Sequence, residues 1–149
     1  MKAIIVYDSL YGNTEKIANS IAQGIGGEVK VVKVGEANAA ELGTYDLAVI
    51  GSPTQGGKHT KLMQEFLRKI PDGTLKNNKV AAFDTRLKNM FVKLFGWGAS
   101  HIADELIGKG AKLVAPSEGF FVKSAKGPLV EGETERATAW GKAIAAKIK

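Results

Sequence analysis

The chain repeats one pattern along its length: a short run of β-branched apolar residues, a turn-like loop, and a stretch with helical spacing. Residues 2–7 (KAIIVY) form such a run, which is typical of a strand buried on both faces in a parallel sheet. Residues 14–24 follow, with apolar side chains recurring at helical spacing from Ile17 to Ala22. Strands and helices that alternate in this way favour an α/β fold.

The same alternation continues to the end of the chain. Further strands are predicted at 28–34, 46–51, 79–83 and from about residue 112, and further helices at 36–42 (or a turn), 62–70, 99–107 and from about residue 133. Right-handed crossovers would place helices on both faces of the resulting five-stranded sheet. We therefore expect one doubly wound domain over residues 1–149, with a ligand crevice outside the carboxyl ends of the strands.

Composition narrows the classes of function. The sequence has no cysteine, which excludes disulfides, thiolate metal sites and a catalytic thiol, so redox chemistry would need a bound cofactor. No apolar run is long enough to span a bilayer, and the first residues lack the features of a signal peptide. We therefore expect a cytoplasmic protein with no membrane partner. The formal net charge of +6 favours an acidic partner, whereas the lack of a basic run argues against nucleic acid.

The loop after the first strand has the chemistry of an anion site. It leads directly into a helix and reads Ser9-Leu10-Tyr11-Gly12-Asn13-Thr14. N–H groups at a helix N-terminus are unsatisfied donors at the positive end of the helix dipole. The loop adds hydroxyl and amide side chains and no carboxylate. The same residue types are also common as plain helix caps and in turns, which is the alternative interpretation.

This loop and its flanking segments resemble the flavodoxin signature. The residues at the signature's spacing are Ile5, Val6, Tyr7, Ser9, Gly12, Thr14, Ala18 and Ile21. The resemblance implies a flavodoxin-like doubly wound sheet of five parallel strands in the order 2-1-3-4-5, FMN as the cofactor with its phosphate in this loop, and electron transfer as the function. Tyr11 departs from the many flavodoxins that have Thr here, so one hydroxyl contact to the phosphate is missing or replaced.

Two further loops complete the site that the resemblance implies. The loop after the third strand contains Pro53-Thr54-Gln55-Gly56-Gly57-Lys58 and resembles the flavodoxin ring loop. In that family a glycine peptide flips so that its carbonyl accepts a hydrogen bond from N5 of the reduced flavin, and glycine makes the flip easy. The loop after the fourth strand begins Asp84-Thr85-Arg86, and its amides are expected beside the ring. Pro and paired Gly also occur in plain surface turns, which is the alternative for the ring loop.

Aromatic residues stand in unusual places for this family. Flavodoxins commonly stack aromatic side chains on the flavin, but residues 52–59 contain none except His59. Trp97 could stack on the ring from the predicted loop, as could Phe91 and Phe95. Rings at such spacing could equally belong to the core or to an interface.

The charges near the predicted ring are a second departure, because acidic residues usually surround the flavin of flavodoxins. Lys58, Arg86 and Lys88 would instead favour an anionic reduced flavin, unless they are simply solvated side chains on a rim. His59 and His101 are isolated in the sequence and lack a triad partner. We therefore predict no catalytic residue and no metal site.

These observations predict an FMN-binding, flavodoxin-like electron-transfer protein with an acidic redox partner protein. We expect a monomer or a weak homodimer. Two alternatives stay open: a small FMN-dependent NAD(P)H or quinone-type reductase, and an interaction module that has kept the fold but lost the flavin.

Overall fold

The computed structural model describes residues 1–88 and 97–148. Its centre is one sheet in which all strand pairings are parallel. The strands are β1 (Lys2–Tyr7), β2 (Glu28–Lys33), β3 (Leu47–Pro53), β4 (Lys79–Leu87), β5 (Lys112–Leu113) and β6 (Glu118–Val122). The sheet order is β2-β1-β3-β4-β5, and β6 also pairs with β4. The predicted order 2-1-3-4-5 is therefore confirmed, with the fifth position divided between β5 and β6.

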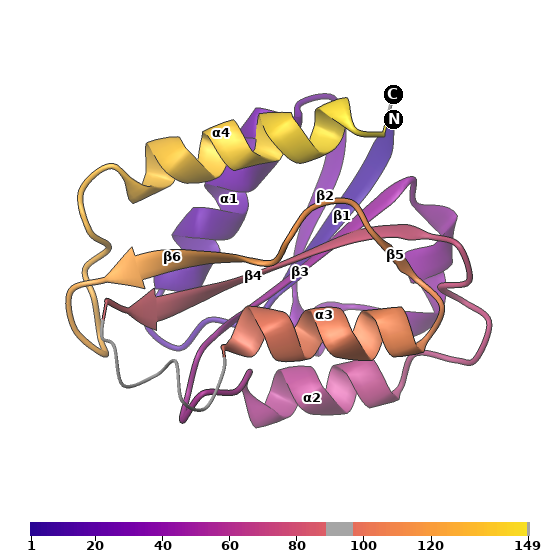
Figure 1. Cartoon of the computed structure of the whole chain (residues 1–149), viewed down its shortest axis with the longest axis horizontal. Helices are drawn as coiled ribbons and strands as arrows, with labels where there is room; N and C mark the ends of the chain where they lie inside the picture. The colour runs from indigo at the N-terminus through magenta and orange to yellow at the C-terminus, as the bar shows by residue number, and fades with distance from the viewer. Residues whose placement is uncertain (89–96, 149) are drawn as a thin grey trace.

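Helices cover both faces of this sheet, as predicted for a doubly wound fold. They are α1 (Asn13–Ile25), α2 (Lys61–Arg68), α3 (Gly98–Gly108) and α4 (Glu133–Ala146), with 3-10 turns η1 (Val34–Glu36) and η2 (Ala39–Thr44) after β2. Figure 1 shows α1 and α4 together on one side of the sheet and α2 and α3 on the other. Within the described residues, no helix is long and apolar enough to cross a membrane.

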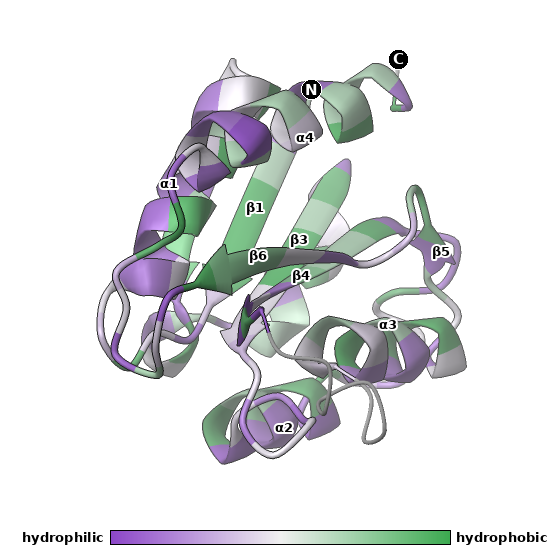
Figure 2. Ribbon diagram, turned by 60° about the vertical axis from the view of Figure 1, so that its left-hand side comes forward, coloured by the Kyte–Doolittle hydropathy of each residue, from purple (hydrophilic) through white to green (hydrophobic). Residues whose placement is uncertain are grey.

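The apolar runs of the sequence become strands because both of their faces are buried. In β1, Ile4 packs into the core under α2 and α3, whereas Ile5 packs into the core under α1 and α4. Both side chains are fully buried, and each such burial contributes roughly 1.5–3 kcal/mol. Figure 2 shows the resulting hydrophobic central strands, β1 and β3, with more polar helix surfaces around them.

Helices α1 and α4 approach each other closely enough that their contact requires glycine. A Cβ atom on Gly24 would collide with the backbone of Thr138, and one on Gly141 would collide with the backbone of Ile21. The absence of a side chain at both positions lets the two backbones meet. This contact fixes α1 against α4, and both helices pack on the same face of the sheet.

The predicted end of the fourth strand was wrong. We expected a strand at 79–83 followed by a loop, but β4 continues through Leu87 and pairs there with β6. Asp84 and Arg86 are therefore strand residues on the same side of β4, and they form an ion pair that makes burial of a carboxylate tolerable. The long-range partner strand that extends β4 leaves no local signal in the sequence. Phe91 and Phe95 lie outside the described residues.

Candidate functional site

A pocket of about 330 Å³ opens at the carboxyl ends of β1, β3, β4 and β6, where the fold predicts a ligand crevice. Most of the predicted site residues line it: Ser9, Leu10, Tyr11, Asn13, Thr14, Pro53, Thr54, Gln55, Gly56, Gly57, Thr85 and Arg86. Gly12, Lys58, Asp84 and Trp97 are not among the residues that line it. The structure thus brings the three predicted segments to one place.

The first loop is shaped by a serine and a glycine. The hydroxyl oxygen of Ser9 accepts hydrogen bonds from the backbone N–H groups of Gly12 (3.1 Å) and Glu15 (3.4 Å). Gly12 precedes α1 and has a φ of 91°, in the left-handed region that favours glycine. The chain therefore curls around the Ser9 side chain before the helix begins.

This curl leaves several backbone donors at the pocket. Within residues 1–88 and 97–148, the backbone N–H groups of Leu10, Tyr11, Asn13 and Thr14 have no hydrogen-bond acceptor. They lie at the amino end of α1, where the helix dipole favours negative charge. None of the described residues that line the pocket is an aspartate or a glutamate. The arrangement therefore offers the hydrogen-bond donors that phosphate binding requires. No carboxylate among the described lining residues would repel the phosphate.

The acidic residue nearest to these donors in α1 is Glu15, and its carboxylate is hydrogen-bonded to another side chain. Glu15, in the first turn of α1, accepts a hydrogen bond of 2.6 Å from the Tyr7 hydroxyl. Burial of the phenol, together with this carboxylate, raises the pKa of Tyr7 to about 12. Tyr7 consequently keeps its proton and remains a donor to Glu15 at neutral pH.

Side-chain contacts tie the first loop to the far side of the pocket. The hydroxyl groups of Thr14 and Thr85 are 2.8 Å apart and share a hydrogen bond. The Asn13 amide donates to the backbone carbonyl of Lys126 at 3.2 Å. A Cβ atom on Gly127, which has a φ of 98°, would collide with that amide. The loop is therefore held by β4 and by the segment that follows β6.

The second loop is a tight turn with two glycines at its tip. Gln55 and Lys58 exchange backbone hydrogen bonds of 2.7 and 3.0 Å, and between them Gly56 and Gly57 have φ values of 55° and 80°. Positive φ at both central residues is typical of a type I′ turn, which strongly favours glycine. In the described part of the chain neither glycine N–H has an acceptor, so this turn also presents free backbone donors.

The base of the second loop is rigidly attached to its surroundings. The backbone N–H of Thr54 donates to the carbonyl of Thr85 at 2.9 Å. At the other end, the N–H of Thr60 donates to the Ser52 hydroxyl at 2.9 Å, and the Thr60 hydroxyl donates to Asp8 at 2.5 Å. The tip can present its backbone to a ligand while the base keeps its position.

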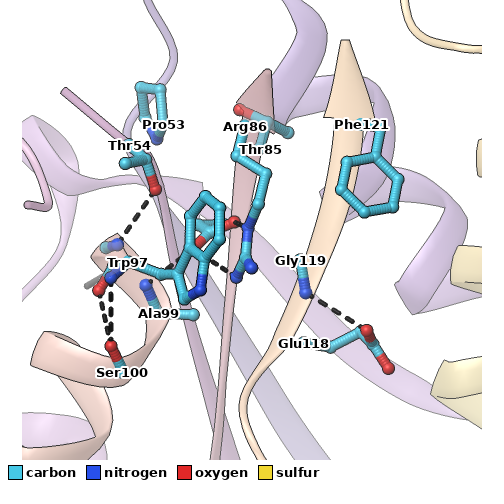
Figure 3. Close-up of polar contacts among 12 residues, drawn as sticks. Pro53, Thr54, Thr85, Arg86, Trp97, Ala99, Ser100, Glu118, Gly119 and Phe121 are labelled. Atoms are coloured by element: carbon cyan, nitrogen blue, oxygen red, sulfur yellow. Dashed lines mark hydrogen bonds and ion pairs between the residues drawn. The ribbon is translucent and has the colours of Figure 1, made fainter. Parts of the chain in front are cut away.

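The third wall of the pocket is built around Arg86 (Figure 3). Its guanidinium donates hydrogen bonds of 2.7 and 2.9 Å to the two carboxylate oxygens of Asp84, which also accepts one from the N–H of Ala99 at 2.9 Å. Asp84 is fully buried. Burial raises the pKa of the Asp84 carboxyl, and the hydrogen bonds from Arg86 oppose this effect.

Trp97 and Gly119 confine the same guanidinium. The Trp97 ring centroid lies 3.7 Å from the central carbon of the Arg86 guanidinium, a cation–π contact, and Figure 3 shows the indole beside it. A Cβ atom on Gly119 would collide with the guanidinium. The Trp97 ring thus has Arg86 as a partner, and the charge of Arg86 is paired with Asp84. Of the three predicted cations, only Lys58 and Lys88 are exposed.

Sequence reasoning missed one side of the pocket. Val122 and Ala125, from the end of β6 and the segment after it, also line the pocket, as does Leu87 beside Arg86. Because β6 lies beside β4, its carboxyl end reaches the same edge of the sheet. The topology could therefore have indicated a fourth segment, although the residue types there carry no signal of their own.

His59, for which no role was predicted, is buried behind the second loop. Its Nε2 atom lies 3.2 Å from the Glu105 carboxylate, and its ring stacks on that of His101 with centroids 6.2 Å apart. Nδ1 has no hydrogen-bond partner among the described residues. Burial lowers the pKa of His59, although Glu105 opposes this, so the neutral imidazole is favoured.

Comparison with known proteins agrees with this geometry. The family described as the flavodoxin domain matches residues 4–91. The chain belongs to the flavodoxin family. A flavodoxin of Maridesulfovibrio salexigens is 28% identical over 156 residues, which cover 99% of each chain. An uncharacterized protein of Methanocaldococcus jannaschii, MJ0298, is 34% identical over 119 residues, which cover 76% of this chain and 71% of that protein.

A solved structure gives the same result for the whole fold. Oxidised Flavodoxin 2 from Bacillus cereus superposes with a TM-score of 0.83 at 27% identity, with 99% of both chains covered. The predictions of a flavodoxin-like fold, and of an FMN-dependent electron-transfer protein, are confirmed at the level of the family.

Proposed function

We propose that this flavodoxin holds FMN in the pocket, with the phosphate at the amino end of α1 and the flavin ring against the Gly56–Gly57 turn. FMN supplies the chemistry of accepting and donating electrons. The observation that carries the proposal is the set of free N–H groups in the first loop, together with a pocket lining that contains no carboxylate in the described residues.

The protein's contribution is to bind and orient the cofactor. Ser9 fixes the curl of the first loop through its two accepted hydrogen bonds, so the free donors are already in place before the phosphate arrives. The shared hydrogen bond between Thr14 and Thr85 keeps this loop at a constant distance from β4. Binding is favoured when donors are organised in advance, because less ordering entropy is lost.

The other residues in and around the pocket have proposed roles as well. Gly56 and Gly57 would contact the ring through their backbone, since neither has a side chain to intervene. Val122, which is buried in the wall of the pocket, would exclude water from the apolar part of the ring. Gly12, Lys58, Asp84 and Trp97 would act indirectly, by shaping the loops or by holding Arg86.

We also propose that the whole chain, residues 1–149, works as one domain in the cytoplasm. The oligomeric state that we propose is a monomer or a weak homodimer. The net charge of +6 supports an acidic protein as redox partner. The described residues contain no run of lysines and arginines that would support nucleic acid as that partner.

Titration of the flavin-free protein with FMN and with riboflavin tests this function. FMN should bind one to one and lose its fluorescence, and riboflavin, which lacks the phosphate, should bind at least about tenfold more weakly. Inorganic phosphate should compete with FMN. Equal affinity for the two flavins would remove the phosphate site from the proposal, and unquenched FMN fluorescence would refute the function as a whole.

A further inference from the structure

Exposed apolar side chains gather at the mouth of the pocket. Leu10, Tyr11 and Leu87 all line the pocket, yet they are 49%, 55% and 36% exposed. Among the described residues, only three other large apolar side chains are comparably exposed, and none of those lines this pocket. Apolar side chains that cluster on a surface in this way mark interaction sites more often than scattered ones do.

Three exposed lysines stand next to pocket-lining residues in the sequence. Lys58, Lys88 and Lys126 each directly follow a pocket-lining residue, and all three are exposed. The Nζ atom of Lys126 is 6.0 Å from the Tyr11 ring centroid, which places it beside the apolar side chains. None of the three lysines forms an ion pair within the described residues. We call these three lysines, with Leu10, Tyr11 and Leu87, the rim.

The carboxylates next to pocket-lining residues do not neutralise the rim. Asp8 accepts the hydrogen bond from Thr60, and Glu15 accepts that from Tyr7. Asp84 is buried and paired with Arg86. Each of these carboxylates is engaged within the protein. All three lysines are exposed, and Lys88 lies 6.0 Å from the Phe121 ring and also interacts electrostatically with Glu133.

We propose that the rim is the docking face for a protein partner whose contact surface has an apolar centre surrounded by carboxylates. The complementary charges would steer the partner towards the pocket mouth and select its orientation. Desolvation of Leu10, Tyr11 and Leu87 would hold the complex together once it has formed. The inference rests on the proposed function, because docking at this mouth brings a redox partner beside the cofactor.

A pair of charge-matched variants tests the rim. K58E/K88E/K126E reverses its three lysines. The control K76E/K79E/K112E reverses three exposed lysines around the opposite, amino-terminal ends of β4 and β5, where Lys79 pairs with Lys112. Each variant lowers the net charge from +6 to zero, because every exchange removes two charges. The Lys126 contact to Asn13 uses the backbone carbonyl and is therefore retained.

The probe is a fluorescent oligoglutamate peptide with a central tryptophan, and its binding is measured by anisotropy. The rim variant should lose roughly tenfold or more in affinity, and the control should stay within about twofold of the original protein, since only charges at the contact act strongly in salt. An equal loss in both variants, or none in the rim variant, would overturn the proposal.

Two other probes test the chemistry of the partner. A peptide without the tryptophan should bind more weakly, and equal binding would contradict the apolar centre. A short DNA duplex at the same salt concentration should bind less tightly than the peptide. If the duplex binds more tightly and depends on the rim lysines, the face is a nucleic-acid site and the proposal is wrong.

FMN titration of the same samples separates this inference from the proposed function. If rim-dependent peptide binding persists in a protein that binds no FMN, the docking face stands and the function fails. If FMN binds normally while the peptide ignores the rim, the docking face alone fails.

Discussion

Two walls of the pocket differ in how their polar groups are satisfied. In the first loop and the Gly56–Gly57 turn, several backbone N–H groups have no acceptor in the described chain. In the wall around Arg86, the guanidinium is held by Asp84, Trp97 and Gly119. The first wall can gain hydrogen bonds from a ligand, and the second already has its own. The first should therefore determine affinity for FMN, and the second should determine the stability of the fold.

The largest effect is expected for Asp84→Ala. This substitution leaves Arg86 without the carboxylate that pairs with it, and loss of one partner of a buried ion pair typically lowers the free energy of unfolding by about 3–5 kcal/mol. Urea denaturation of the flavin-free protein measures the loss. The double variant Asp84→Ala/Arg86→Met removes the stranded charge and should be less destabilised. If it is as unstable as the single variant, the ion pair is not what holds this wall.

Glu133 and Arg136 lie behind the Arg86 wall, where Arg136 donates to the carbonyl of Gly119. Substitution of Glu133 should give a smaller, pH-dependent loss of stability. Burial raises the pKa of Glu133, but hydrogen bonds from Arg136 and from the Phe121 N–H more than offset this and leave the pKa lowered. A lowered pKa in the folded state adds stability at neutral pH that is lost as the pH falls through the folded-state pKa. Glu133→Gln should therefore lower the free energy of unfolding by about 1.5–3 kcal/mol near pH 7. The deficit should shrink in acid.

Urea denaturation at several pH values checks this second prediction. A deficit that stays constant down to acidic pH would show that the charge of Glu133 is unimportant and that only the shape of the side chain matters. Glu131→Gln provides a control, because Glu131 is an exposed carboxylate of the same segment.

Ser9→Ala changes the first loop, and it should weaken FMN binding more than it lowers the stability of the fold. Loss of the hydroxyl removes the acceptor that shapes the first loop, so FMN affinity should fall by roughly tenfold, as expected for a hydrogen bond of about 1 kcal/mol or slightly more. The unfolding free energy of the flavin-free protein should change by less than about 1 kcal/mol. A large loss of stability with unchanged FMN affinity would contradict the division between the two walls.

The smallest effect is expected for His59, which is buried and whose Nδ1 atom has no hydrogen-bond partner within residues 1–88 and 97–148. Because burial lowers its pKa, the unfolded chain takes up the proton more readily, and stability should decline as the pH falls below the unfolded-state value. His59→Gln cannot titrate, so the decline between pH 7 and 5 should be shallower in this variant. Parallel pH series of denaturation curves give the difference, and identical slopes would exclude His59 as its source.

The difference between the walls also explains what could be predicted from the sequence. The first loop is a local motif: Ser9, Gly12 and Thr14 lie within six residues, and their residue types together with the family resemblance predict an anion site there. The Gly56–Gly57 turn is local too. The strands β1 and β3 follow from buried apolar runs, and the sheet order follows from the family resemblance.

The Arg86 wall depends on contacts that are distant in sequence. The prediction placed Asp84 and Arg86 in a loop, since nothing nearby in the sequence indicates that Gly119 and Trp97 would confine the Arg86 guanidinium. The close contact of Gly24 with Thr138 is equally distant. Such arrangements arise from tertiary packing, which overrides local propensity, and a single sequence does not encode them in a recognisable spacing.

The division of the edge strand has a consequence for changes in chain length. Lys112 pairs with Lys79 in β5, and Glu118 pairs with Phe83 in β6, so β4 is contacted by two separate short strands. The Val114 N–H still donates to the carbonyl of Val80, and Ala115 packs against the core, so only residues inserted at 116–117 would alter neither pairing register. A longer connection could be inserted there while Val122 kept its place in the pocket, which makes this break a natural point for grafting new segments onto the protein.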